Sequence, residues 1–201
     1  PFIICATAGT VNTGAIDPLA EIADIARQQD LWYHVDAAFG AALRFSDTHK
    51  HRLSGMERAD SIAFDFHKWM QVNYDAGCVL IRDGATHRRS FSDRPDYLME
   101  TSRGMAAGGV WPVDLGPELS RGFRALKVWA QINEHGTEKL GRVVERNIDQ
   151  AAYLAQQVGS SADLELLAPV KLNICCFRFT SPGASMSELD ALNEELVIRL
   201  Q

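Results

Sequence analysis

Long hydrophobic runs are absent from this sequence of 201 residues. No stretch reaches the roughly 18 consecutive apolar residues of a membrane-spanning helix, and no charged segment followed by an apolar one marks a secretory leader. Basic residues are also few, since 20 Lys and Arg stand against 26 Asp and Glu and form no cluster. We therefore expect a cytoplasmic protein that binds neither nucleic acid nor a membrane.

Cysteine is scarce, and its spacing does not fit a disulfide framework or a metal site. The four Cys residues include no CxxC pair. Three of them lie in apolar runs, where a reduced thiol acts as a small hydrophobe, so we expect them to be buried and unpaired. His34 with Asp36, and His49 with His51, have no third or fourth ligand at a recognisable spacing, so no metal is expected. A Walker loop and a GxGxxG motif are missing as well.

The two ends of the sequence favour a piece of a longer protein. It begins at Pro1 within an apolar run, without an initiator Met, and stops at Gln201 within a helix-like pattern. The hydrophobic content of 46% is enough to bury a core, and the length is that of one to two domains.

The first part of the sequence alternates short apolar segments with helical stretches. This pattern is typical of βαβ units and a mainly parallel sheet, which is an α/β fold. Strands are predicted at residues 2–6, 31–36, 61–65 and 78–82. After the first strand, Asp17 is predicted to cap a helix whose first residue is Pro18.

Residues 94–113 interrupt this regular pattern. Pro95 and several glycines break any periodicity there, and a loop of this length is usually mobile or functional. Beyond it, helices are predicted at residues 118–134 and 137–158, with Gly136 between them as a C-terminal cap.

The last part of the sequence has the pattern of a small α+β unit. A strand is predicted at residues 173–180, followed by a helix that begins at Ser187. We therefore divide the chain into part of a large domain at residues 1–134 and a linking helix with a partial small domain at residues 135–201.

An acid and an amine follow two of the predicted strands. Asp36 ends one strand, and Lys68 follows another, 32 residues later. The carboxyl ends of parallel strands line the crevice where ligands bind. Taken singly, such an Asp is often a helix cap and such a Lys a solvated charge. Together they fit pyridoxal phosphate (PLP), which needs an amine to bond to its aldehyde and a carboxylate to keep its ring nitrogen protonated.

Four stretches resemble one enzyme family. Residues 61–70, SIAFDFHKWM, resemble the PLP-attachment signature of the group II amino-acid decarboxylases. Residues 6–10 followed by 34–38, and residues 120–127, are similar to the same family. The resemblance implies the large domain of a PLP-dependent transferase of fold type I, with a mainly parallel sheet of seven strands in the complete family. It also implies the start of a small α+β domain and a homodimer.

The resemblance further implies roles for single residues. Lys68 is expected to hold PLP as a Schiff base, and Asp36 to pair with the ring nitrogen. His67 is expected near the phosphate and the Schiff base, and the Ala38 methyl group against the ring. Thr10 is also placed at the cofactor site, and the expected catalytic residues are Lys68 and His67.

The reaction implied by the resemblance is decarboxylation of an L-amino acid to its amine and CO2. In the aromatic branch of the family, a Tyr on a loop closing over the site protonates the product carbon. Residues 102–114 hold no Tyr, although Tyr97 is close by in the sequence. The alternatives are a PLP-dependent aldehyde synthase, an aldol-type carbon–carbon lyase or desulfurase on the same scaffold, and a catalytically incomplete fragment. The sequence does not identify the amino acid.

Overall fold

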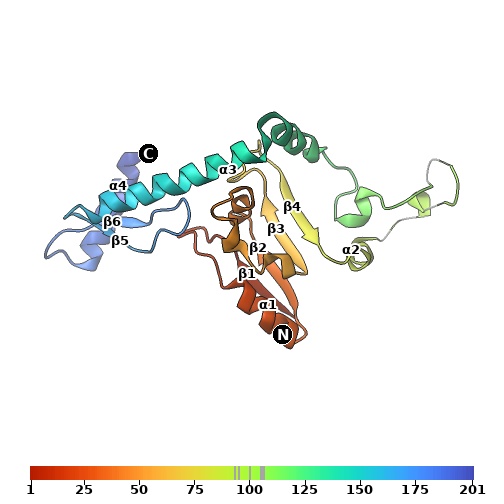
Figure 1. Ribbon diagram of the computed structural model, residues 1–201, viewed down its shortest axis with the longest axis horizontal. Coiled ribbons are helices and arrows are strands. Elements are labelled where there is room, and N and C mark those ends of the chain that lie inside the picture. Colours follow the sequence, from red (N-terminus) through yellow and green to blue (C-terminus); the bar gives the residue numbers. More distant parts are fainter. Residues whose placement is uncertain (93, 95, 100, 105–106) are drawn as a thin grey trace.

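The computed structural model describes residues 1–92, 94, 96–99, 101–104 and 107–201. A central four-stranded sheet is crossed on one side by the long helix α3 (Figure 1). The elements β5, β6 and α4 gather at one end of this helix, and α2 lies beyond the other end. None of the helices in these described ranges combines the length and apolar character needed to cross a bilayer.

The sheet confirms the prediction of a mainly parallel arrangement. Its strands are β1 (Ile3–Thr7), β2 (Trp32–Asp36), β3 (Ser61–Asp65) and β4 (Gly77–Ile81), in that spatial order. The first three are parallel, and β4 is antiparallel to β3. Asp36 pairs in register with Ala63, so β2 and β3 end at the same edge of the sheet.

The first helix, α1 (Leu19–Gln28), begins later than the sequence indicated. Its N-cap position is Pro18, without a side-chain cap, so the predicted capping role of Asp17 is wrong. Asp17 Oδ2 instead accepts a hydrogen bond of 2.7 Å from the Thr7 backbone N–H at the end of β1. This carboxylate therefore stabilises the strand end rather than the helix.

The long helix α3 (Arg124–Gly159) combines the two helices predicted from the sequence. It starts at Arg124 instead of residue 118, and Gly136 breaks its regular geometry with φ 72° and ψ 154°. The predicted interruption at Gly136 is therefore confirmed, because a positive φ is readily adopted only by glycine.

The remaining elements show where local signals misled the prediction. Helix α2 (Gly84–Phe91), capped by Asp83, was not predicted. The predicted strand at 173–180 shortens to β6 (Phe177–Phe179), which pairs with β5 (Leu164–Leu166).

The last helix, α4 (Met186–Leu200), has a different cap from the predicted one. It is capped by Ser185, and Ser185 and Glu188 bond each other's backbone N–H in a capping box. The prediction of Ser187 at the start of this helix is therefore wrong.

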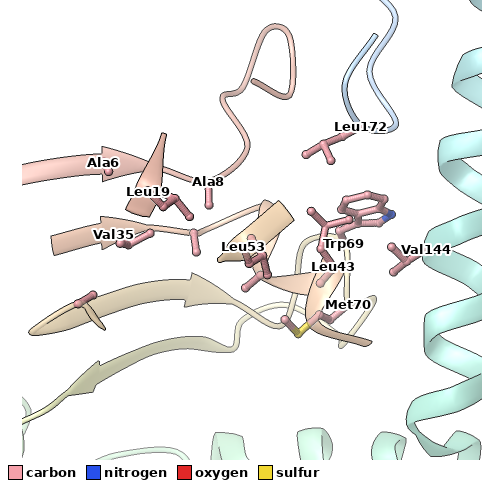
Figure 2. Close-up of a cluster of buried hydrophobic side chains, with 14 of the residues drawn as sticks. Ala6, Ala8, Leu19, Val35, Leu43, Leu53, Trp69, Met70, Val144 and Leu172 are labelled. Carbon is pink, nitrogen blue, oxygen red and sulfur yellow. The ribbon is translucent and has the colours of Figure 1, made fainter. Parts of the chain in front are cut away.

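One apolar core joins the sheet to the later elements. Val35 in β2 and Leu43 after it are fully buried, and Trp69, Val144 in α3 and Leu172 belong to the same cluster (Figure 2). This cluster contains residues from both predicted domains. The division at residues 134 and 135 stays a prediction.

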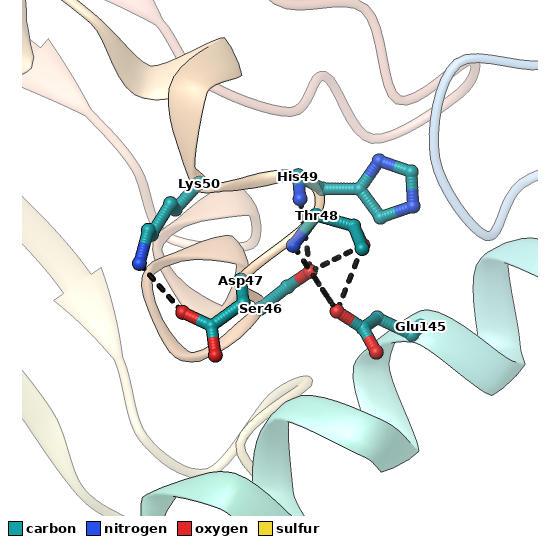
Figure 3. A network of polar contacts seen from close by, with 6 residues as sticks. All are labelled: Ser46, Asp47, Thr48, His49, Lys50 and Glu145. Carbon is teal, nitrogen blue, oxygen red and sulfur yellow. Dashed lines mark hydrogen bonds and ion pairs between the residues drawn. The ribbon is translucent and has the colours of Figure 1, made fainter.

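A polar contact fixes α3 to the turn that follows β2. Glu145 Oε1 accepts hydrogen bonds from Ser46 Oγ at 2.7 Å and from Thr48 Oγ1 at 2.8 Å (Figure 3). These bonds, the first from the fully buried Ser46, lower the pKa of the Glu145 carboxyl group below its ordinary value. The same turn, η1 (Gly40–Phe45), packs against Gly141 of the helix.

The predicted burial of the cysteines is wrong. All four are free, Cys5 is exposed, and Cys78, Cys175 and Cys176 are half-buried. Cys5 shares one face of β1 with Ile3, which is 38% exposed, because alternate residues of a strand point to the same side. An apolar strand does not by itself show that both of its faces are covered.

The segment predicted as a loop at residues 94–113 contains a short turn, η4 (Asp96–Leu98), and leads into η5 (Pro112–Leu115). Its base is held by the buried Asp114, which accepts bonds from Arg94 Nε at 2.6 Å and from the Trp111 backbone N–H at 3.0 Å. The Arg94 guanidinium holds the pKa of the Asp114 carboxyl group well below its usual range. Pro95, which contributed to the loop prediction, lies outside the described residues.

Candidate cofactor site

The Asp36 carboxylate lies at the carboxyl end of β2 and is open to solvent. Its Oδ1 atom accepts a hydrogen bond of 3.0 Å from the Ala38 backbone N–H, which fixes the direction of the side chain. In the part of the chain that the structure describes, the Oδ2 atom has no partner. Asp36 therefore presents one oriented, free acceptor at the edge of the sheet.

The Lys68 amine lies in the turn after β3, at the same edge. Its Nζ atom is 2.9 Å from Asp65 Oδ2, and the Lys68 side chain is 43% exposed. Exposed ion pairs of this kind contribute only about 0–1 kcal/mol, so the amine is easily released. The Asp65 backbone N–H also donates to the Ala38 carbonyl oxygen at 3.3 Å, which ties the two strand ends together.

This ion pair was not predicted from the sequence. The signal for it is the spacing of three residues between an acid and an amine within a single turn.

His67 is held in one orientation. Its Nδ1 atom accepts a hydrogen bond of 2.9 Å from the Ala76 backbone N–H, and its ring lies edge-on to Tyr74 with centroids 4.6 Å apart. Because Nδ1 is the acceptor, the neutral ring carries its proton on Nε2. His67 therefore offers a directed N–H donor beside the lysine in the chain.

Thr10 lies in the turn after β1, the strand next to β2. Its Oγ1 atom accepts a bond of 3.0 Å from the Ala15 backbone N–H and shares another, of 2.9 Å, with Thr13 Oγ1. The hydrogen bonds of the Thr10 hydroxyl group are therefore formed with residues of the same turn. Ala38, by contrast, is half-buried and lies between the ends of β2 and β3.

These residues fit the reactive parts of PLP. The described edge supplies a weakly paired amine at Lys68 for the aldehyde, and a free carboxylate oxygen at Asp36 for the ring nitrogen. A cavity of about 780 Å³ lies elsewhere, beside β4, α2 and the start of α3, and neither residue lines it. Among the described residues, no group of three or more His, Cys, Asp or Glu side chains is arranged to hold a metal ion.

Comparisons with known proteins point to one family. The profile of the pyridoxal-dependent decarboxylase conserved domain matches residues 1–180. An aromatic-L-amino-acid decarboxylase from Bacillus atrophaeus is 36% identical over 98% of this chain and 41% of its own length. The chain therefore spans about two fifths of this curated relative.

Solved structures show the same fold. The structure of Oryza sativa TDC with PLP and tryptamine is 30% identical, with a TM-score of 0.89 over 98% of this chain and 41% of that one. The Rhodiola rosea 4-hydroxyphenylacetaldehyde synthase is 29% identical, with a TM-score of 0.83 over 100% of this chain and 40% of that one. The profile match over most of the chain and the similarity of the fold lead to one conclusion: the chain belongs to the pyridoxal-dependent decarboxylase family, whose cofactor is pyridoxal phosphate.

Proposed function

We propose that the full-length polypeptide containing this chain is a PLP-dependent decarboxylase that converts an L-amino acid to its amine and CO2. The observation that carries the proposal is the placement of Asp36 and Lys68 at one edge of the sheet, Asp36 at the end of β2 and Lys68 in the turn that follows the adjacent parallel strand β3. An amine and a free carboxylate at one sheet edge are the two groups that PLP requires. Membership of the decarboxylase family supports the same reaction.

The bound cofactor supplies an electron-accepting ring that takes up the electron pair released when the bond from Cα to the carboxylate breaks. The chain's own residues orient the reacting groups and place charge. Lys68 Nζ, which lies beside Asp65 Oδ2, would be the amine that holds the cofactor through its aldehyde carbon, and it would be a free amine whenever the substrate amine occupies that carbon. Asp36 Oδ2 would accept a hydrogen bond from the protonated ring nitrogen and so favour the positively charged ring.

The other predicted residues complete this proposal. The His67 Nε2–H group would donate a hydrogen bond to the phosphate or to the nitrogen of Lys68, and the Ala38 methyl group would pack against the ring. Lys68 and His67 are the proposed catalytic residues. Thr10 would contribute beside the ring only if its hydroxyl group adds a bond to those within its turn.

The substrate class we propose is an aromatic L-amino acid. The support comes from the relatives, which include a tryptophan decarboxylase from Oryza sativa subsp. japonica and a tyrosine decarboxylase from Narcissus pseudonarcissus, 31% and 32% identical. The alternative product is an aldehyde, as the aldehyde synthase among the similar solved structures indicates. We favour the amine as product because the sequence relatives given above are decarboxylases.

We further propose a cytoplasmic homodimer, as the family resemblance implies. Large apolar side chains on the surface at the start of α3 support an interface between copies. Phe123, Leu126 and Trp129 are 77%, 52% and 63% exposed. Apolar patches of this kind are typical of protein–protein contacts.

The test is covalent attachment of PLP to Lys68 in the full-length polypeptide. After reduction with borohydride, we expect the mass of reduced PLP on the peptide that contains Lys68, and its absence in Lys68→Ala. Lys50→Ala is a matched control, because Lys50 pairs with Asp47 three residues away and its side chain is 44% exposed, against 43% for Lys68. Attachment that persists in Lys68→Ala contradicts the proposal.

A further inference from the structure

Trp69 directly follows Lys68 in the chain, but the two side chains differ in their exposure to solvent. Lys68 is exposed, whereas Trp69 is only 6% exposed and belongs to the core. The Trp69 ring stacks on the Phe39 ring, with centroids 5.0 Å apart and planes 11° from parallel. Phe39 directly follows Ala38 and lies three residues after Asp36. One aromatic stack therefore joins the segment that carries the amine to the segment that carries the carboxylate.

Helix α3 holds the same tryptophan from the other side. The Trp69 Nε1–H group donates a hydrogen bond of 3.0 Å to Asn147 Oδ1. Asn147 Nδ2 donates to Gln150 Oε1 at 3.2 Å, so the oxygen end of the amide is the one that faces the indole. Figure 2 shows Trp69 between the strand-end loops and α3, with its indole nitrogen turned toward the helix. A second bond of 2.6 Å joins Gln131 Nε2 to the Met70 carbonyl oxygen.

The helix is itself fixed to the turn that follows Phe39. A side chain added at Gly141 would meet the Phe45 carbonyl oxygen at 2.2 Å, so helix and turn are in close contact. Half a turn before Asn147, Glu145 bonds the buried Ser46. The contacts thus close a ring that runs from the end of β2 through η1 and α3 to Trp69, and back to Phe39 through the stack.

We propose that Trp69 and Asn147 are positioning residues that set the separation between the Lys68 amine and the Asp36 carboxylate. This inference rests on the proposed function. PLP is a rigid ring, so its aldehyde carbon and its ring nitrogen are a fixed distance apart, and both groups bind well only at a matching separation. The Phe39 stack sets the lateral position of the Trp69 segment, and the Asn147 bond sets the tilt of the indole.

The experiment measures PLP affinity in the full-length polypeptide and in a double-mutant cycle. Trp69→Phe keeps an aromatic ring against Phe39 but loses the donor, and Asn147→Leu loses the acceptor. Each is expected to raise the Kd for PLP about five- to tenfold, the value of one hydrogen bond. The double variant is expected to be no weaker than either single one, because both remove the same contact. We also expect the pH at the midpoint of the absorbance change of the bound cofactor to differ from that of the wild type in the same three variants.

Val158→Ala is the control for a merely structural effect. Val158 is buried in the same helix, eleven residues after Asn147, and does not belong to the core cluster that contains Trp69, so the melting temperature is expected to fall while the Kd for PLP and the pH profile stay as in the wild type. Equal weakening of PLP binding by Val158→Ala overturns the inference, as do additive effects of Trp69→Phe and Asn147→Leu. If the wild type does not attach PLP to Lys68, the proposed function fails; if it does and the variants bind normally, only the inference fails.

Discussion

The role proposed for the Asp36 carboxylate depends on its negative charge, so we expect that an amide of the same shape does not replace it. Asn in its place keeps the hydrogen bond from the Ala38 backbone N–H but has no negative charge to hold a proton on the ring nitrogen. We expect Asp36→Asn to lower kcat/KM for decarboxylation on the order of 10²-fold, the usual effect of losing one preorganised electrostatic contact. Steady-state CO2 release measures it. Asp47→Asn, at an aspartate that pairs with Lys50, should leave the rate unchanged, and equal losses in both variants contradict the assignment.

A substitution at Tyr97 tests whether this residue decides between the two products considered for this scaffold, the amine and the aldehyde. Tyr97 is the one tyrosine in the sequence of residues 94–113, and its side chain is 78% exposed in the turn η4. If it delivers the proton to the product carbon, Tyr97→Phe lowers amine formation by about 10²-fold, as expected for a lost general acid, and raises the share of aldehyde. Chromatography of amine and aldehyde measures the ratio. Tyr153→Phe, at another exposed tyrosine, is the control, and an unchanged amine yield in Tyr97→Phe excludes this role.

At the scale of single elements, Gly141 determines how closely α3 approaches the turn after β2. A methyl group there would lie 2.2 Å from the Phe45 carbonyl oxygen, so the helix would have to shift. Gly141→Ala is expected to destabilise the protein by about 1–3 kcal/mol. At Gly159, a methyl group meets no atom within 4 Å, so Gly159→Ala should be neutral or stabilising by up to about 1 kcal/mol. Urea denaturation compares the two, and equal stability contradicts the close contact.

The contact of Glu145 with the turn depends on pH. Hydrogen bonds from Ser46 and Thr48 lower the pKa of this carboxyl group in the folded state. Its contribution to stability is therefore complete above its unfolded pKa, about 4.3, and is lost as the pH falls through the lower folded value. The difference in urea midpoint between wild type and Glu145→Gln should shrink as the pH falls from about 6 to 3. A difference that is constant over this range contradicts the role of the charge.

The sequence predicted the strands better than the helix ends. The ends of each predicted strand of the large sheet lie within one residue of the observed ends. Short apolar runs bounded by polar residues are compatible with few structures other than a strand. Helix starts depend on which polar side chain finds a partner. Asp17 is used by the Thr7 backbone N–H, and Ser185 rather than Ser187 completes a capping box. These choices are made by tertiary contacts, which a local pattern does not contain.

The candidate site was predicted in part. Strand ends and chemistry were enough to select Asp36 and Lys68, because parallel strands bring both to one edge. The sequence did not reveal the stack of Phe39 on Trp69 or the bond to Asn147, since these residues are 30 and 78 positions apart. Contacts at such separations follow from how the elements pack rather than from any local pattern.

At the scale of the whole molecule, the core crosses the predicted boundary between residues 134 and 135. Leu172 is fully buried, and its side chain lies close to Gly9 and Gly14 in the turn after β1. Leu172→Ala is expected to cost about 2–5 kcal/mol, the range for a fully buried leucine. Leu167→Ala in the same segment, where the side chain is 50% exposed, should cost much less.

The number of transitions in the unfolding curve tests whether the contact of Leu172 with the turn after β1 makes the two parts of the chain unfold together. If Leu172 joins residues 1–134 and 135–201 into one cooperative unit, Leu172→Ala moves the single urea transition seen by both fluorescence and circular dichroism. The PLP site should then weaken in parallel with stability, because the turn after β1 lies next to β2 and Asp36. Two separate transitions, with only the later segment affected, would instead show that residues 135–201 unfold independently of the cofactor site.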